Sequence, residues 1–332
     1  MADPVLSVRH LSVEFTTDDG QVHAVDDVSF DLARGETLGI VGESGSGKTV
    51  TSLALLGLLP RTAAITGEAR FDGANLLALD EKRLQPVRGN RIAMIFQDAL
   101  TALNPVHRVG DQIAEAIAVH HAVGRGELHE RAVALLELVG IPQPESRAGE
   151  YPHQFSGGMR QRAMIAMAIA NEPDVLIADE PTTALDVTIQ AQVLDVLARI
   201  QDRTDTAIIL ITHDLGVVAG VADRVLVMYA GREAEIGSVD DIFYRPGHPY
   251  TRGLLGSLPR LDRREHGQRL FQIGGQPPSL IFVPTGCAFH PRCPYADNDL
   301  CVSVVPETQA LDAGHRSACH YAAALDEQVA RV

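Results

Sequence analysis

The stretch LGIVGESGSGKTVTSLALLGLL, residues 38–59, combines three features in a fixed order. Residues 38–41 are an apolar run that predicts a buried strand, and a helix is predicted after Thr49 because leucines recur at helical spacing. These leucines are Leu53, Leu56 and Leu59. Between strand and helix lies the pattern Gly-x-x-x-x-Gly-Lys-Thr. Such a strand, glycine loop and helix predict a site where backbone N–H groups surround phosphate oxygens at a helix N-terminus.

The side chains of this loop match a nucleotide site. Lys48 supplies a positive charge for the β- and γ-phosphates, and the Thr49 hydroxyl suits Mg²⁺. A glycine turn that matches by chance is the alternative, but the chain contains only two lysines, which makes a chance match improbable. We therefore expect ATP to contact these residues: Gly42, Ser44, Gly45, Ser46, Gly47, Lys48 and Thr49.

A second apolar run ends in two acidic residues. In DVLIADEPTTALD, residues 174–186, the run 175–178 predicts a central parallel strand. Asp179 is then placed to hold the Mg²⁺ shell, and Glu180 to orient or deprotonate an attacking water. The alternative is an acidic pair that only caps the next helix.

A third strand is predicted at residues 208–211 of TAIILITHDL, and His213 lies just beyond its end. Open α/β sheets bind ligands at this end of their strands. A lone histidine there is more often structural. Together with the glycine loop and the Asp179–Glu180 pair, it becomes a candidate contact for the γ-phosphate.

Composition narrows the classes of function. With 332 residues, 45% hydrophobic and 21% charged, the chain fits one main domain and a smaller tail. Its net charge of −15 repels nucleic acid phosphates, so nucleic acid is not an expected partner. The first residues lack a signal peptide, and no stretch approaches the roughly 20 apolar residues of a membrane span. We expect a cytoplasmic protein.

All four cysteines lie near the C-terminus, in a region rich in Pro, Gly and Arg that begins near residue 240. In a reducing compartment, such a group predicts metal binding more than disulfides. The spacing Cys-x5-Cys-x7-Cys-x17-Cys is wider than that of usual zinc knuckles, and four thiolates suit Zn²⁺ or a [4Fe–4S] cluster equally by softness. The ligands would be Cys287, Cys293, Cys301 and Cys319.

Further motifs give a family resemblance. FSGGMRQR, residues 155–162, resembles the signature motif of ABC-transporter ATPases, and MIFQD, which contains Gln97, resembles their Q-loop. With the glycine loop, LIADE, ALD at 184–186 and His213, the motifs follow the family's order. HPYT at 248–251 and the cysteine tail resemble the ATP-binding subunits of dipeptide and oligopeptide importers.

The resemblance implies an α/β fold: a P-loop NTPase (RecA-like) core of the ABC type, with an antiparallel β portion, a helical subdomain and a loop-rich C-terminal extension. We expect the ATPase domain over residues 1–240, its helical subdomain at about 98–160, and the extension over 241–332. The resemblance also favours the [4Fe–4S] cluster over zinc. We expect metal loss to destabilise the tail while leaving the phosphate chemistry intact.

The resemblance also implies how the site works. Two ATPase subunits pair head to tail, so that the signature of one faces the P-loop of the other. It assigns catalytic roles to Glu180, His213 and Gln97, and Mg²⁺ contacts to Thr49 and Gln97. It assigns further nucleotide contacts to Phe15, Ser156, Gly157, Gly158, Asp179 and Asp186. Two departures, Met159 and Ala99, are expected to alter only fine geometry.

The expected function is that of an ATP-hydrolysing subunit that energises a membrane importer for dipeptides or oligopeptides. Its partners would be a second ATPase subunit, favoured to be a paralogue, two membrane-spanning permease subunits and an extracytoplasmic binding protein. Its place would be the cytoplasmic face of the inner membrane. The alternatives are another cargo such as nickel, or a soluble ABC ATPase that acts on nucleic acid or ribosomes.

Overall fold

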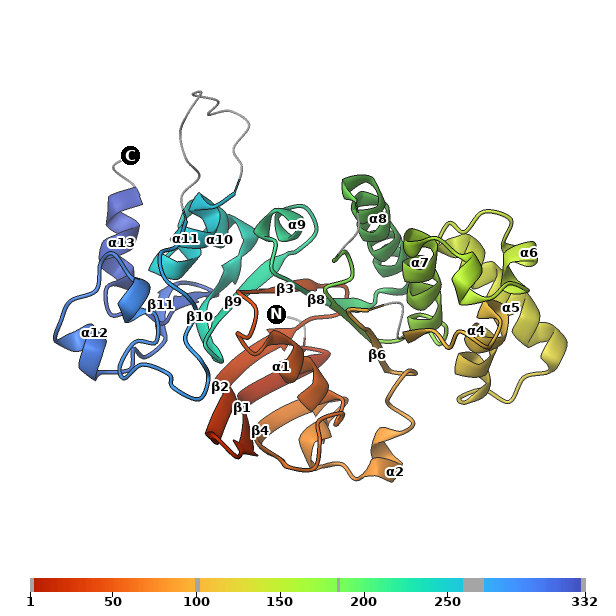
Figure 1. Ribbon diagram of the computed structural model, residues 1–332, viewed down its shortest axis with the longest axis horizontal. Helices are drawn as coiled ribbons and strands as arrows, with labels where there is room; N and C mark the ends of the chain where they lie inside the picture. Colours follow the sequence, from red (N-terminus) through yellow and green to blue (C-terminus); the bar gives the residue numbers. More distant parts are fainter. Residues whose placement is uncertain (1–2, 99–101, 184–185, 259–271, 330–332) are drawn as a thin grey trace. The chain divides into compact units, whose positions relative to one another are not determined.

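The computed structural model describes residues 3–98, 102–183, 186–258 and 272–329, with the side chains of 326–329 left aside (Figure 1). The chain forms two compact units. The first unit consists of Met1–Leu6, Leu32–Glu36 and Ala78–Ile211. The second unit consists of Ser7–Asp31, Thr37–Leu77 and Thr212–Val332.

The second unit carries a four-stranded sheet in the order β2-β1-β4-β5. Apolar residues alternate along β1 with half-buried or exposed ones, so the sheet has one face toward the core. β4 and β5 pair antiparallel. These strands are β1 (Leu6–Thr17), β2 (Gly20–Leu32), β4 (Ala63–Phe71) and β5 (Ala74–Asn75).

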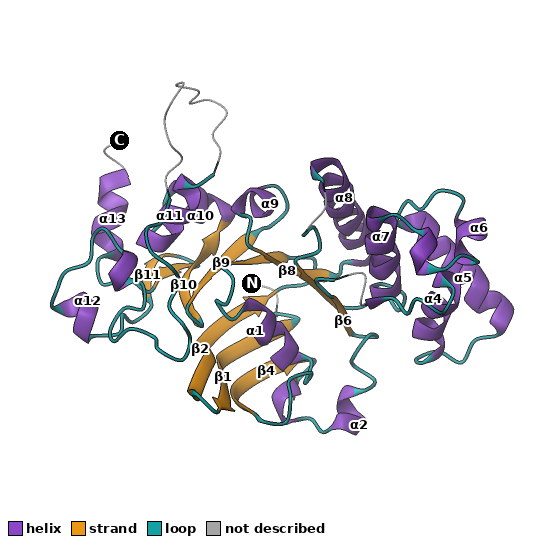
Figure 2. Cartoon of the chain, viewed as in Figure 1, coloured by secondary structure: helices purple, strands orange, loops and turns teal. Residues whose placement is uncertain are grey.

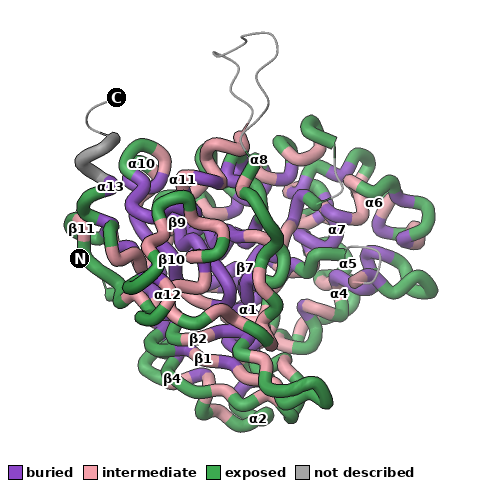
Figure 3. The backbone as a smooth tube through the Cα atoms, turned by 60° about the vertical axis from the view of Figure 1, so that its left-hand side comes forward, coloured by how far each residue is buried: buried purple, intermediate pink, exposed green. Residues whose placement is uncertain are grey.

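Five more strands of the second unit lie side by side in the order β11-β12-β10-β9-β3. β3 and β9 are parallel, and β9, β10, β12 and β11 pair antiparallel. Figure 3 shows β9 and β10 as buried backbone. Their bounds are β3 (Thr37–Val41), β9 (Arg224–Tyr229), β10 (Arg232–Ser238), β11 (Gln309–Asp312) and β12 (His315–Ser317).

Helix α1 (Lys48–Leu55) begins directly after the glycine loop, as predicted, but it is shorter than the leucine spacing indicated. Gly57 has a φ of 60°, a left-handed conformation typical of the residue after a helix. Leu56 and Leu59 therefore lie beyond the helix, and their spacing reflects packing after its end.

The first unit contains three parallel strands in the order β8-β7-β6. The sequence predicted β7 and β8 to within a residue because both are uninterrupted apolar runs, and every residue of both is buried. The strands are β6 (Ile92–Ile95), β7 (Val175–Asp179) and β8 (Ala207–Thr212).

Helices make up most of the rest of the first unit, and Figure 2 shows α4, α5, α6 and α7 packed together. In α8, Val193, Val196, Leu197 and Ile200 are buried, and their spacing places them on one face of the helix. The bounds are α2 (Glu81–Leu84), α4 (Val109–Ala118), α5 (Arg125–Leu138), α6 (Pro144–Ala148), η2 (Pro152–Gln154), α7 (Gly157–Ala168) and α8 (Val187–Thr204).

The C-terminal region of the second unit is only partly loop-rich. Residues 272–289 contain neither helix nor strand, but β12 adds to the sheet by pairing with β10. The remaining elements are η1 (Leu76–Ala78), α9 (Leu215–Ala219), α10 (Val239–Tyr244), α11 (Pro249–Gly256), η3 (His290–Arg292), α12 (Leu300–Ser303) and α13 (Ala322–Val329). Across the described ranges, no helix has the length and apolar character that crossing a membrane requires.

Candidate functional site

The glycine loop connects β3 to α1 and encloses the side chain of Lys48. The Lys48 Nζ donates hydrogen bonds to the carbonyl oxygens of Gly42, at 2.8 Å, and Glu43, at 2.9 Å. It also lies 3.4 Å from the Ser46 Oγ, and the residue is buried. Thr49 follows as an exposed residue in the first turn of α1. The positive charge of Lys48 therefore lies at the N-terminus of α1, where the helix dipole also stabilises a bound phosphate.

Two glycines of the loop are required by close backbone contacts. Gly47 has a φ of 98°, and a Cβ there would lie 2.3 Å from the carbonyl oxygen of Ala24. A Cβ at Gly42 would lie 2.3 Å from the carbonyl oxygen of Met228. Because side-chain atoms do not fit at these distances, the packing around the loop fixes both residues as glycine.

In the first unit, the acidic pair stands at the end of β7. Asp179 is the last residue of the strand and is buried. Glu180 follows with a φ of 47°, unusual for a residue with a side chain, and its N–H donates to the Ile211 carbonyl at 2.9 Å. Its carboxylate accepts from the Gln97 Nε2, at 3.0 Å, and from the Thr183 Oγ1, at 2.7 Å. The contact between Gln97 and Glu180, 83 positions apart, was not predicted.

The signature residues begin a helix. Ser156 is the N-cap of α7, and its Oγ accepts a hydrogen bond from the Met159 N–H at 3.3 Å. Gly157 and Gly158 are the first residues of the helix, so their amides lie at its positive end. Asp186 caps α8 in the same way, by accepting from the Ile189 N–H at 3.0 Å.

The remaining predicted contacts are placed individually. His213 is exposed and directly follows β8, and Phe15 is half-buried in β1, two residues after the buried Val13. Ala99, and the first two residues of the ALD motif, lie outside the described residues.

The four cysteines of the second unit line one small cavity, of about 20 Å³. Burial raises the pKa of the Cys287 thiol, and raises those of Cys293 and Cys319 to about 11. The neighbouring thiols add to the rise, because thiolates repel each other. Cys301 is buried. Among the residues that the structure describes, no group of three or more His, Cys, Asp or Glu side chains is arranged to hold a metal ion.

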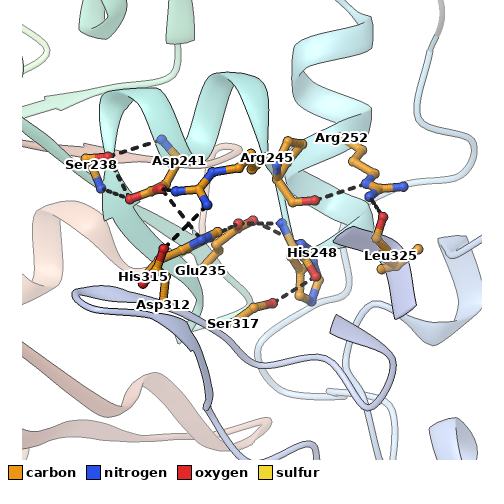
Figure 4. Close-up of polar contacts among 12 residues, drawn as sticks. Glu235, Ser238, Asp241, Arg245, His248, Arg252, Asp312, His315, Ser317 and Leu325 are labelled. Atoms are coloured by element: carbon orange, nitrogen blue, oxygen red, sulfur yellow. Dashed lines mark hydrogen bonds and ion pairs between the residues drawn. The ribbon is translucent and has the colours of Figure 1, made fainter. Parts of the chain in front are cut away.

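A buried carboxylate fastens the C-terminal region to β10 (Figure 4). Glu235, fully buried, accepts hydrogen bonds from the N–H groups of Gly247, at 2.6 Å, and His248, at 3.0 Å, and its Oε1 lies 2.8 Å from the His315 Nε2. These contacts offset the cost of burying the charge. Sequence reasoning missed Glu235 because its partners are distant in sequence.

His248 is the N-cap of α11, and its Nδ1 accepts from the Tyr250 N–H at 3.0 Å. Burial lowers the pKa of His248 to about 4, so its imidazole is neutral near pH 7. Arg252, one turn later in α11, donates to the Pro246 carbonyl at 3.1 Å and to the Leu325 carbonyl (Figure 4). The HPYT segment thus serves as a structural joint within the second unit.

Comparison with known proteins agrees with these features. Residues 25–183 match the ABC transporter family, and residues 234–301 match the family described as oligopeptide/dipeptide transporter, C-terminal region. The chain is 57% identical to the dipeptide transport ATP-binding protein DppD of Bacillus subtilis, over 88% of this chain and 87% of the relative. It is 51% identical to the oligopeptide transport ATP-binding protein OppD of Salmonella typhimurium, over 96% and 94%.

Solved structures share the fold. The cassette MJ0796, described as a bacterial ABC transporter cassette, matches with a TM-score of 0.64 and 25% identity over 70% of this chain and 98% of that one. The cbiO1 protein of Clostridium perfringens, part of an ABC transporter complex, matches with a TM-score of 0.62 and 29% identity over 73% and 91%. With a P-loop and a signature helix in place, and with these relatives, the chain belongs to the ABC transporter ATPases, in the group of dipeptide and oligopeptide transport ATP-binding proteins.

Proposed function

We propose that this ABC ATPase energises the import of dipeptides or oligopeptides across a membrane. The observation that carries the proposal is the match of residues 234–301 to the C-terminal region of oligopeptide/dipeptide transporters, joined to full-length relatives named for those substrates. Cargo such as nickel, and soluble action on nucleic acid or ribosomes, have no comparable support.

The residues of the chain support specific roles in hydrolysis. Lys48 and the loop amides would hold the phosphates of ATP, and Thr49, Gln97 and Asp179 would hold Mg²⁺. Glu180 accepts a proton from the water that attacks the γ-phosphorus. The bond to the β–γ bridging oxygen breaks, which leaves ADP and phosphate. His213 contacts the γ-phosphate, and Phe15 stacks on adenine.

The signature residues belong to a second nucleotide. Ser156, Gly157, Gly158 and Asp186 lie at the N-termini of α7 and α8, where anions are favoured. Ser156, Gly157 and Gly158 would complete the ATP site of a paired ATPase subunit, which we expect to be a paralogue. The further partners are two permease subunits and an extracytoplasmic binding protein, with this chain peripheral on the cytoplasmic face of the inner membrane. We keep residues 1–240 as the ATPase domain, with its helical subdomain at about 98–160, and 241–332 as the extension.

Assembly with membrane subunits tests this function. Co-expressed with its permease and ATPase partner subunits, the chain is expected to fractionate with membranes and to hydrolyse ATP faster when the binding protein is loaded with a dipeptide or oligopeptide. Loading the binding protein with nickel instead should give no stimulation. Hydrolysis that never responds to the membrane subunits would contradict the importer function.

We propose that the four cysteines hold a [4Fe–4S] cluster as the resident group of the extension. All four line one cavity, and soft thiolate donors are the usual ligands of this cluster. The raised pKa values of the Cys293 and Cys319 thiols mean that a positive centre is needed to hold these two groups as thiolates near pH 7. When bound, the cluster would cross-link the tail. Zn²⁺ is the alternative occupant.

Metal analysis distinguishes the occupants. Anaerobically purified protein is expected to be brown and to contain about four iron and four sulfide per chain, the content of one cube. Cys301→Ser should lose the colour and expose the tail to protease, whereas His290→Gln, which changes another residue lining the cavity, should keep the colour. Colourless protein with one zinc per chain would show that zinc, and not the cluster, occupies the site.

A further inference from the structure

The first variable residue of the P-loop, Glu43, is held by two residues of the C-terminal region. Its N–H donates to the Tyr250 hydroxyl at 2.8 Å. Its carboxylate forms a two-pronged ion pair with Arg292, with the Nη1 2.6 Å from Oε2 and the Nη2 2.9 Å from Oε1. Paired hydrogen bonds of this kind fix orientation as well as position. Through Glu43, the C-terminal region therefore holds the P-loop in place.

Arg292 is itself fixed on all sides. Its side chain is 5% exposed, and its guanidinium lies 5.8 Å from the ring centre of Tyr229 and 5.9 Å from that of Phe289. The Nε donates to the Gly274 carbonyl at 2.9 Å, and the Nη1 donates to the Tyr229 hydroxyl at 3.2 Å. The hydrogen bond to Glu43 raises the pKa of Arg292 above its usual value, so the guanidinium stays charged.

The same aromatic residues join the two holders of Glu43. The rings of Tyr229 and Tyr250 lie 4.6 Å apart, and Phe289 lies 5.2 Å from Tyr229 and 5.5 Å from Tyr250. Tyr250 is fully buried. Arg292 and Tyr250 thus act from one packed cluster.

Arg292 also lies inside the cysteine segment. It ends η3, between Cys287 and Cys293. The His290 N–H donates to the Cys287 carbonyl at 2.9 Å, and the Cys293 N–H donates to the His290 carbonyl at 3.2 Å. Because these turns connect Arg292 to both cysteines, the positions of Cys287 and Cys293 set where the guanidinium is presented.

Glu43 contacts the lysine that would bind the phosphates. The Glu43 carbonyl accepts a hydrogen bond from the Lys48 ammonium at 2.9 Å. The Glu43 carboxylate would oppose an incoming phosphate, and its pairing with Arg292 offsets that charge. Loss of Arg292 would therefore release the loop and leave a negative charge beside the anion.

We propose that Arg292 is a positioning residue for ATP binding, which braces the P-loop from the C-terminal region and couples the four-cysteine site to nucleotide affinity. The inference rests on the proposed function, in which this loop holds ATP. It also revises the expectation that metal loss at the cysteines leaves the phosphate chemistry intact, because Arg292 connects the cysteine segment to the P-loop.

The test compares Arg292 with a matched arginine of the same region. Arg316 forms an equivalent two-pronged pair with Glu233, at 2.7 and 2.9 Å, and also donates to the Ser29 carbonyl. In the full-length chain, Arg292→Ala is expected to weaken ATP·Mg²⁺ binding tenfold or more by calorimetric titration. Arg316→Ala should change the Kd by less than twofold.

Two further variants separate bracing from general damage to the fold. Arg292→Lys, which keeps the charge, should recover part of the affinity, and Glu43→Gln should reduce the effect of Arg292→Ala by removing the unpaired carboxylate. In the assembled transporter, Arg292→Ala should raise the KM for ATP and leave kcat nearly unchanged. If Arg292→Ala leaves the Kd for ATP unchanged, or if Arg316→Ala weakens ATP binding as much as Arg292→Ala does, the proposed bracing role of Arg292 is wrong.

A separate experiment tests the coupling between the cysteines and ATP binding. Cys293→Ser is expected to weaken ATP binding in the wild-type background and to add little in the Arg292→Ala background. Equal losses in both backgrounds, or none in either, would reject the coupling. Lys48→Ala separates the two proposals: if it abolishes ATP binding while Arg292→Ala has no effect, the P-loop assignment stands and the brace fails. Wild-type protein that does not bind ATP would refute the proposed function itself.

Discussion

Glu180→Gln is expected to bind ATP·Mg²⁺ with nearly wild-type affinity and to hydrolyse it about 10²- to 10⁴-fold more slowly, the usual contribution of a general base. The amide has the shape of the carboxylate, and the Gln97 and Thr183 side chains that contact Glu180 can both rotate to suit it. The amide cannot accept the proton of the attacking water. Single-turnover hydrolysis and ATP titration of the assembled transporter measure the two quantities.

Glu172 offers a matched control for this variant. It has a φ of 50°, close to that of Glu180, and precedes β7 where Glu180 follows it. Glu172→Gln tests the same chemical change in a similar backbone conformation and should leave turnover unchanged. Turnover near wild type in Glu180→Gln would remove Glu180 as the base.

Lys48→Ala is expected to weaken ATP binding about a hundredfold, the order of magnitude for a lost charge-assisted hydrogen bond in a phosphate site. The reason differs from that for Glu180, because the ammonium contacts the bound phosphates before any chemistry occurs. ATP titration of the full-length chain, with thermal unfolding to show that the variant is folded, measures the effect.

The only other lysine of the chain serves as the control. Lys82 is exposed in α2, so Lys82→Ala should keep the affinity for ATP. Unchanged affinity in Lys48→Ala would contradict the assignment of residues 42–49 to phosphate binding.

Local sequence patterns were enough for the central strands and for the start of the helix after the glycine loop. β3, β7 and β8 are apolar runs that end where polar or glycine residues begin, so burial alone predicts them. Ser156 and Asp186 are residues that favour N-caps, and both cap helices. The end of α1 was placed too late because leucines continue beyond Gly57, although the backbone turns there.

Contacts between distant residues could not be predicted. Arg292 and Glu43 are 249 positions apart, and His315 and Glu235 are 80 apart, so no periodicity connects them. Glu235 lies in a strand whose central residues are all buried, and its charge alone would suggest an exposed position. Only the fold brings the partners that make such burial favourable.

Uptake into proteoliposomes tests the central claim most directly. Vesicles that contain the permease subunits with this chain and its partner ATPase should accumulate a radiolabelled dipeptide or oligopeptide when given the binding protein, Mg²⁺ and ATP. Vesicles with Glu180→Gln in this chain should accumulate far less, while Glu172→Gln vesicles match wild type. Uptake that proceeds at the wild-type rate with Glu180→Gln, or that does not depend on ATP, would contradict the account.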